Sequence, residues 1–188
     1  MSSKDKKCRL GAISHELVFF CVAIFWLILD LWTKYLVYAS MRVGQTIELP
    51  VSWLQLTYVR NCGGAFGVLE DYKVFFICAA IMTLACAYWM FPHLCRAFGY
   101  AGSAVTAVIV AGAVGNLYDR LRFGYVVDFL DLKWWPVFNV ADIGITVGFT
   151  LFVYALFFTD RGKRLLDDGD SEEKSPAPKT DSSKDSEV

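Results

Sequence analysis

The sequence predicts an all-α membrane protein with four transmembrane helices and a small β-containing segment outside the membrane, between the first and second helices. Two observations predict this class. Of the 188 residues, 56% are hydrophobic, and the mean hydropathy is +0.43. The apolar residues are gathered into runs of about 20 that are apolar on every side. Such runs suit a lipid environment, whereas a soluble domain shows one-sided amphipathic elements.

Four apolar runs can each cross the hydrocarbon core of a bilayer as a helix. We expect them at residues 17–38, 74–91, 101–118 and 142–158. The first run is too long for the apolar part of a cleavable signal peptide, and no small-residue cleavage site follows it, so we expect it to be retained. The chain is thus expected to comprise an N-terminal segment (1–16), a membrane domain (17–159) and a C-terminal tail (160–188).

Positive charge near the ends of the runs predicts the orientation, because cytoplasmic ends carry an excess of Lys and Arg. Both termini and the link between the second and third runs are expected in the cytoplasm, since they carry Lys4, Lys6, Lys7, Arg9, His93, Arg96, Arg161, Lys163 and Arg164. Segments 39–73 and 119–141 then face outward, where positive residues are accompanied by acidic ones. The hydrophilic tail is expected to be disordered.

The first outer segment contains the expected β-structure. Residues 46–59 (TIELPVSWLQLTYV) mix β-branched and aromatic side chains with partial alternation, which predicts a strand, and RNCGG at 60–64 predicts a turn after it. Tyr125 and the tryptophans at positions 53, 134 and 135 are expected at the depth of the lipid headgroups.

Several kinds of function are excluded by residue types. A formal net charge of -1, without a basic field, argues against a nucleic-acid partner. Only Cys62 of the six cysteines reaches an outer segment, so no disulfide framework is expected. Both histidines, His15 and His93, fall on the inner side, which leaves no outer zinc site and no base for a serine nucleophile. Carboxylate chemistry remains on the outer side.

Asp128 and Asp142 each lie where an apolar stretch meets a polar one. A carboxyl inside the membrane costs roughly 2.5–3.5 kcal/mol, so such residues usually have a function. Two carboxyls that share a site hold one proton between them, leaving one base to activate water and one acid to polarise a carbonyl. The simpler alternatives are a helix N-terminal carboxylate for Asp142 and a loop carboxylate paired with Arg120 or Arg122 for Asp128.

Five sequence boxes, in order, resemble the lipoprotein signal peptidase (signal peptidase II) family. They are D-x-x-x-K at 30–34, RNCGGAF at 60–66, GNLYDR at 115–120, VDF at 127–129 and FNVAD at 138–142. The match covers roughly residues 15–160. Gly64 and Gly67 stand where the family often has Ala and Ser, which adds backbone freedom to the first outer segment.

The resemblance implies an aspartic endopeptidase of the bacterial cytoplasmic membrane, with its active site toward the outer face. This enzyme would remove the signal peptide from prolipoproteins, cutting on the amino side of a cysteine that carries a diacylglyceryl group. The resemblance implies no metal or organic cofactor. The substrate and its acyl chains would arrive from membrane lipid through a lateral opening, and the chain is expected to act as a monomer.

The resemblance also assigns individual residues. It implies that Asp128 and Asp142 are the catalytic pair and that four further residues line the active site, namely Asn61, Asn116, Arg120 and Asn139. Asp30 and Lys34 match a supporting pair. Because they are four positions apart on one helix face, we expect them to neutralise each other. Asp119 is expected to be a salt-bridged helix end beside Arg120, outside the catalytic set.

The three asparagines have two possible roles. Their amide groups could donate hydrogen bonds to a tetrahedral oxyanion or to the substrate backbone. Alternatively, they could make turns and cap helices, a role that suits Asn139, three positions before Asp142. In the third run, Ala107, Ala111 and Gly115 recur every four residues, which permits close helix packing.

Two other classes of function use the same residues. In a small ion- or proton-coupled transporter, the intramembrane carboxylates would mark the ion path. Such a protein would usually contain inverted repeats, and the sequence shows none. A structural or assembly partner held by small-residue helix contacts would leave the outer asparagines and aspartates without a function.

Overall fold

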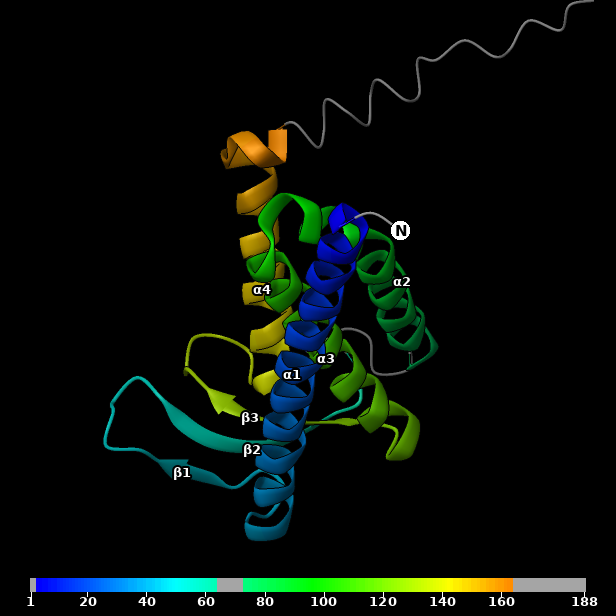
Figure 1. Ribbon diagram of the computed structural model, residues 1–188. Coiled ribbons are helices and arrows are strands. Elements are labelled where there is room, and N and C mark those ends of the chain that lie inside the picture. The colour runs from blue at the N-terminus through cyan, green and yellow to red at the C-terminus, as the bar shows by residue number, and fades with distance from the viewer. Residues whose placement is uncertain (1–2, 64–72, 164–188) are drawn as a thin grey trace, which may run out of the picture.

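The computed structural model describes residues 3–63 and 73–163, with the backbone alone for residues 3–14 and 73 (Figure 1). Within this part of the chain, the long helices are α1 (Ser3–Ser40), α2 (Lys73–Phe98), α3 (Tyr100–Arg122) and α4 (Val140–Phe158). Each contains a stretch long and apolar enough to cross a membrane. The predicted runs lie within these helices, and the predicted class is confirmed. Gly64, Gly67 and the tail from residue 164 onward lie outside the described residues.

The end of α2 differs from the prediction. The apolar run ends near residue 91, but the helix continues through Pro92 and His93 to Phe98. Gly99 follows with a φ of 58°, a left-handed conformation that glycine adopts without a steric penalty. The helix therefore ends where the backbone turns toward α3 and not where hydrophobicity falls.

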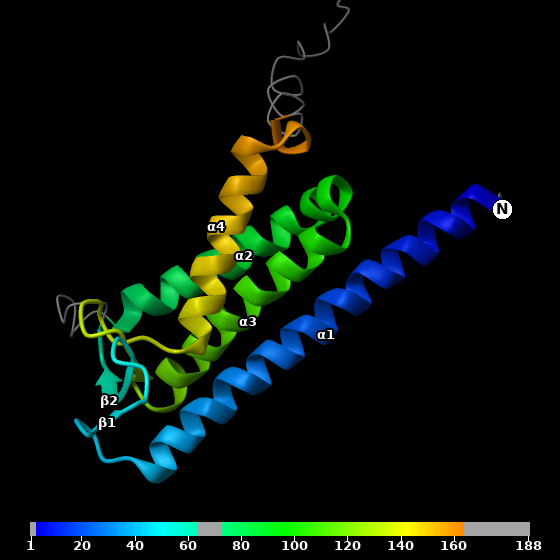
Figure 2. The same cartoon turned by 90° about the vertical axis from the view of Figure 1, so that its left-hand side faces the viewer.

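A three-stranded antiparallel sheet in the order β1-β2-β3 lies at one end of the bundle (Figures 1 and 2). The strands are β1 (Thr46–Glu48), β2 (Gln55–Asn61) and β3 (Val126–Asp131). The prediction of one strand at 46–59 was wrong in its bounds, because a turn around Pro50 divides that segment. Asn61, expected in a turn, pairs with Val126 at the end of β2. The sequence analysis did not predict β3.

Helix α3 is the centre of the bundle. It packs against α1, α2 and α4, and half of its apolar window is buried, a larger share than in the other helices. Ala107 and Ala111 are almost completely buried. A side chain at Gly115 would overlap the Asp30 carboxylate on α1, so the small-residue spacing permits the close helix contacts expected of it.

The sheet is fixed to the end of α1 by a hydrophobic cluster. Val37 near the end of α1 and Met41 just after it pack against Tyr58 on β2 and against Val127 and Phe129 on β3. Because strand side chains alternate between faces, the residue between the last two, Asp128, points to the opposite face. The side chains of Trp53, Trp134 and Trp135 are exposed, whereas Tyr125 is half-buried beneath the Arg60 guanidinium.

Candidate active site

Asp128 and Asp142 reach one cavity from different elements. Asp128 lies in the middle of β3, and its side chain is 2% exposed. Asp142 is half-buried in the first turn of α4. Both line a cavity of about 370 Å³ between the sheet end of the bundle and the segment that follows β3. The structure therefore brings the two predicted carboxyls together.

Both oxygens of the Asp128 carboxyl accept hydrogen bonds from side-chain amides. Asn61 donates to Oδ2 at 2.8 Å, and Asn139 donates to Oδ1 at 2.7 Å. Burial and, to a smaller extent, the nearby charge of Asp142 raise the pKa of Asp128 to about 7, against the opposing effects of these two hydrogen bonds and of the Lys34 charge. Asp128 therefore keeps a proton at a pH where an exposed aspartate would be ionised.

Asp142 is held by the helix cap that the sequence suggested. Asn139 is the N-cap of α4: its side chain accepts from the Asp142 backbone N–H at 2.9 Å, and its own N–H donates to Asp142 Oδ2 at 3.2 Å. Asn116 on α3 donates to the other oxygen, Oδ1, at 2.7 Å. The cap fixes the Asp142 carboxylate in place, so a capping position does not exclude the catalytic role that the resemblance implies for this residue.

Asn116 and Asn139 connect the two acids. The Asn139 amide nitrogen donates both to Asp128 and to Asn116 Oδ1, the latter at 3.1 Å. Lys34 donates to the same Asn116 oxygen at 3.0 Å. Two donors on Oδ1 fix the orientation of the Asn116 amide, so its nitrogen must face Asp142.

A buried ionic cluster supports this network from α1. The Lys34 ammonium lies 2.8 Å from Asp30 Oδ2 and 3.1 Å from Asp119 Oδ2, and all three side chains are nearly inaccessible. The other Asp30 oxygen accepts from the Ala141 backbone N–H at 2.8 Å, beside the cap of α4. The expected Asp30–Lys34 pair is confirmed, and it also fixes the start of the helix that carries Asp142.

The predicted ion-pair partner of Asp119 was wrong. Asp119 pairs with Lys34 across the helix interface and not with Arg120, because adjacent residues of a helix do not face each other. It also accepts a 3.4 Å hydrogen bond from the Val127 backbone N–H, at the start of β3. Sequence reasoning missed this contribution to the site.

Arg120 lines the cavity with both acids and Asn61. Its guanidinium donates to the Asn116 carbonyl at 3.3 Å and lies 5.0 Å from the centre of the Phe76 ring. Among the described residues, neither Arg120 nor Arg122 forms an ion pair with Asp128, contrary to the loop-carboxylate alternative. No group of three or more His, Cys, Asp or Glu side chains in this part of the chain is placed to hold a metal ion.

The three asparagines are oriented toward the acids. Each donates at least one amide hydrogen bond to Asp128 or Asp142. Both amide protons of Asn139 are used within the network, whereas Asn61 and Asn116 each keep one that bonds to no other described residue. Their common contribution is therefore to position the carboxyls.

A fold of four candidate membrane spans with paired aspartates in a cavity at one end defines a multi-pass membrane protein with acid–base chemistry. The family described as signal peptidase (SPase) II matches residues 22–158. The lipoprotein signal peptidase of Halothermothrix orenii is 37% identical over 138 residues, which cover 73% of this chain and 94% of that protein. The lipoprotein signal peptidase of Geobacter sulfurreducens is 38% identical, and the match covers 78% of this chain and 95% of that protein.

Two solved structures, each titled as a bacterial membrane enzyme studied by the in meso method, have the same fold. One, at 2.3 Å resolution, is 28% identical with a TM-score of 0.64 and covers 85% of this chain and 94% of that chain. The other, at 1.9 Å, is 32% identical with a TM-score of 0.65 and covers 74% and 92%.

The chain belongs to the signal peptidase II family. It is an aspartic peptidase of the membrane that cleaves signal peptides from prolipoproteins. Because the chain belongs to this family, the peptidase activity is favoured over the two alternative functions, a small transporter and a structural partner.

Proposed function

We propose that Asp128 and Asp142 are the catalytic pair, and that the substrate is a prolipoprotein cut on the amino side of a diacylglyceryl-modified cysteine. The observation that carries the proposal is the position of the two carboxyls. They reach one cavity from β3 and from α4, and Asn139 hydrogen-bonds to both. A water molecule in this cavity could contact both acids.

The two acids have different roles in the proposed mechanism. Asp128, with its raised pKa, is the acid that holds the shared proton near neutral pH. Asp142 is the base, because its oxygens are more accessible and accept from Asn116 and from a backbone N–H. This assignment describes the resting pair, whose titration is shared between the two residues.

The reaction proceeds by attack of water on the scissile carbonyl carbon. Asp142 takes a proton from the water while Asp128 gives its proton to the carbonyl oxygen, which produces a neutral tetrahedral diol. In the second step the C–N bond breaks, Asp142 returns its proton to the leaving nitrogen, and a diol hydroxyl returns a proton to Asp128. The products are the free α-amine of the lipidated cysteine and a signal peptide that ends in a carboxyl group.

Arg120, Asn61, Asn116 and Asn139 have supporting roles in this proposal. The asparagines position the acids, and the remaining amide protons of Asn61 and Asn116 can donate to substrate backbone. Arg120 supplies the positive charge of the cavity wall and can bind a substrate carbonyl oxygen. Asp30 and Lys34 act indirectly by fixing Asn116 and the start of α4.

The cavity is adjoined by a groove of about 330 Å³ along α4, lined by apolar residues that include Leu132, Trp134 and Val147. The groove and the cavity share Trp135 and Asp142. This continuity supports lateral entry of the acyl chains and signal helix from the bilayer.

We place the enzyme in the bacterial cytoplasmic membrane, with both termini in the cytoplasm and the active site near the outer face. Arg96 in the last turn of α2 and Arg161 shortly after α4 support this orientation. The two helix ends adjoin each other, since Arg161 donates to the Ala97 carbonyl at 3.3 Å, and they lie at the end of the bundle opposite the sheet (Figure 1).

The test is cleavage of a diacylglyceryl-modified prolipoprotein by purified protein in detergent. Asp128→Asn and Asp142→Asn should each abolish cleavage, whereas Asp131→Asn should retain it, because Asp131 lies on the same strand but bonds to Gln55 and Thr57 outside the cavity. The same prolipoprotein without its lipid should not be cut. Appreciable cleavage by either of the first two variants would refute the assignment of the pair.

A further inference from the structure

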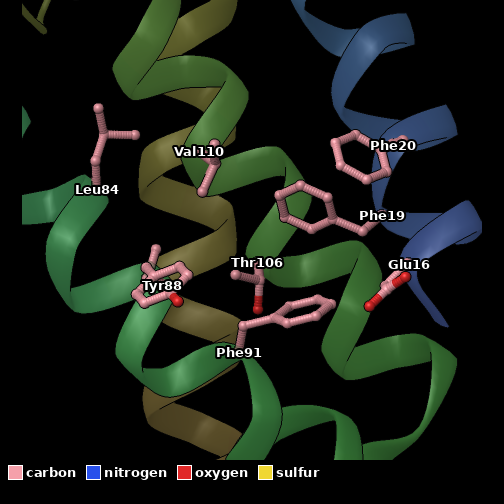
Figure 3. Close-up of a pocket in the computed structure, with 9 residues that line it drawn as sticks. Glu16, Phe19, Phe20, Leu84, Tyr88, Phe91, Thr106 and Val110 are labelled. Atoms are coloured by element: carbon pink, nitrogen blue, oxygen red, sulfur yellow. The ribbon is translucent and has the colours of Figure 1, made fainter. Parts of the chain in front are cut away.

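A second groove, here called the inter-helix groove, lies between α1, α2 and α3 in the half of the bundle farther from the sheet (Figures 2 and 3). Its volume is about 360 Å³, within the range of ligand-binding pockets, and it shares no lining residue with the active-site cavity. It exists because α1 and α2 both pack against α3 but make few contacts with each other.

The floor and walls of the inter-helix groove are apolar. Ala87 and Thr106 form a buried floor, and the Thr106 hydroxyl donates to the Gly102 carbonyl of its own helix at 2.8 Å. Phe19 from α1 and Phe91 from α2 meet edge to face, with ring centres 5.1 Å apart. Such a surface is stabilised by contact with hydrocarbon, and it has few groups that could hydrogen-bond to a polar ligand.

Among the described residues that line the groove, one is charged. Glu16 lies at the rim, exposed, with its carboxylate directed toward the groove (Figure 3). No hydrogen bond or ion pair with another described residue is recorded for Glu16. Glu16 directly precedes the apolar run that begins at Leu17, so this carboxylate lies at the depth of the lipid headgroups.

We propose that the inter-helix groove binds an acyl chain of a bilayer phospholipid whose headgroup carries an ammonium group, and that this ammonium pairs with Glu16. Lipid is the occupant because the groove lies between membrane-spanning helices and is reached from the hydrocarbon. The lining residues of α2 extend from Leu84 to Phe91, about 10 Å along the helix, which accommodates a segment of one chain. The negative charge of Glu16, which has no ion-pair partner among the described residues, selects a cationic group over an anionic headgroup.

The test is a titration of the full-length protein in detergent with phosphatidylethanolamine or phosphatidylglycerol, with the bound fraction measured by native mass spectrometry. Ala87→Leu fills the floor and should weaken phosphatidylethanolamine binding about tenfold, since each displaced methylene is worth about 0.8 kcal/mol. Ala85→Leu is the matched control, because Ala85 is an exposed residue of α2 that does not line the groove. It should bind as the wild type does.

Glu16→Gln tests the headgroup. It should weaken phosphatidylethanolamine binding about two- to fivefold, the range of an exposed ion pair, and leave phosphatidylglycerol binding unchanged. Equal binding by Ala87→Leu and Ala85→Leu would overturn the site. Equal affinity for the two lipids, with no effect of Glu16→Gln, would overturn the choice of headgroup. Prolipoprotein cleavage by all three variants should match the wild type, which confirms that each is folded.

Discussion

The raised pKa of Asp128 predicts that Asp128→Asn changes stability in opposite directions at low and high pH. In the wild type, the pKa of this carboxyl is about 7 in the fold and 3.8 in an unperturbed aspartate. Between these values the folded protein keeps a proton that the unfolded chain releases. The contribution of Asp128 to the free energy of unfolding is therefore fully present below about pH 4. Above that pH it falls by about 1.4 kcal/mol per pH unit, a total loss of roughly 4 kcal/mol by pH 7.

The substitution removes this titration at the cost of one hydrogen bond. Because an amide replaces one Asp128 oxygen with a donor, either Asn61 or Asn139 loses its acceptor, which costs about 1–3 kcal/mol in a buried site. The variant should therefore be less stable than the wild type by about 1–3 kcal/mol at pH 4.5 or below. At pH 8 it should be more stable by a similar amount, although it is inactive.

The measurement is the thermal unfolding midpoint of both proteins in detergent, followed by circular dichroism between pH 4 and pH 8. A difference of 1 kcal/mol corresponds to about 2–4 °C for a protein of this size. Asp131→Asn is the control without a trend in this range. Burial opposes the shift at Asp131, but hydrogen bonds from Gln55, Thr57 and the Lys133 backbone lower its pKa below 3.8. The stability that this carboxylate contributes is therefore fully present above about pH 4 and is lost only at lower pH, so the midpoint difference of Asp131→Asn should stay nearly constant between pH 4 and pH 8. A midpoint difference for Asp128→Asn that does not change sign would refute the reasoning.

Three further outcomes are expected. The kcat/KM for prolipoprotein cleavage should fall about tenfold per pH unit above about pH 7, as Asp128 loses the shared proton, and a flat profile up to pH 9 would contradict this. Lys34→Met should lower stability by about 3–5 kcal/mol because it leaves Asp30 and Asp119 as buried charges, and adding Asp119→Asn should restore part of the loss in a thermal unfolding assay. Gly115→Ala should cost about 1–3 kcal/mol, since the new methyl group overlaps the Asp30 carboxylate, and an unchanged unfolding midpoint would show that α1 can move away.

The spans and the helix cap at Asp142 could be predicted because both depend on local patterns. Continuous apolar runs identify helices that cross a bilayer, and the Asn139 to Asp142 spacing predicts a cap. The end of α2 could not be found in the same way, because helix geometry continues past Pro92 after the apolar run has ended. Its position is set by the backbone turn at Gly99.

The missed features depend on contacts between segments far apart in the chain. Strand β3 is short and owes its conformation to pairing with β2. In this pairing, Asp128 of β3 lies opposite Val59 of β2. The bond from Lys34 to Asn116 joins residues 82 positions apart and exists only because α1 and α3 pack closely. Asp119 was assigned to its neighbour Arg120 because the sequence shows adjacency along the chain, whereas the helix directs the two side chains apart.

The charges of the buried cluster give an independent reason for a proton on the catalytic pair. Lys34 is already paired with Asp30 and Asp119, so this trio has an excess of one negative charge next to Asn116. Arg120 is the one other cationic side chain among the described residues that line the cavity, and it can balance one negative charge of the pair. If Asp128 and Asp142 were both ionised, two uncompensated negative charges would remain in a poorly solvated region. A single shared proton removes one of them. The Lys34 charge by itself lowers the pKa of Asp128, but Asp30 and Asp119 together outweigh that charge, so the net negative charge of the trio favours the protonation state that the proposed reaction requires.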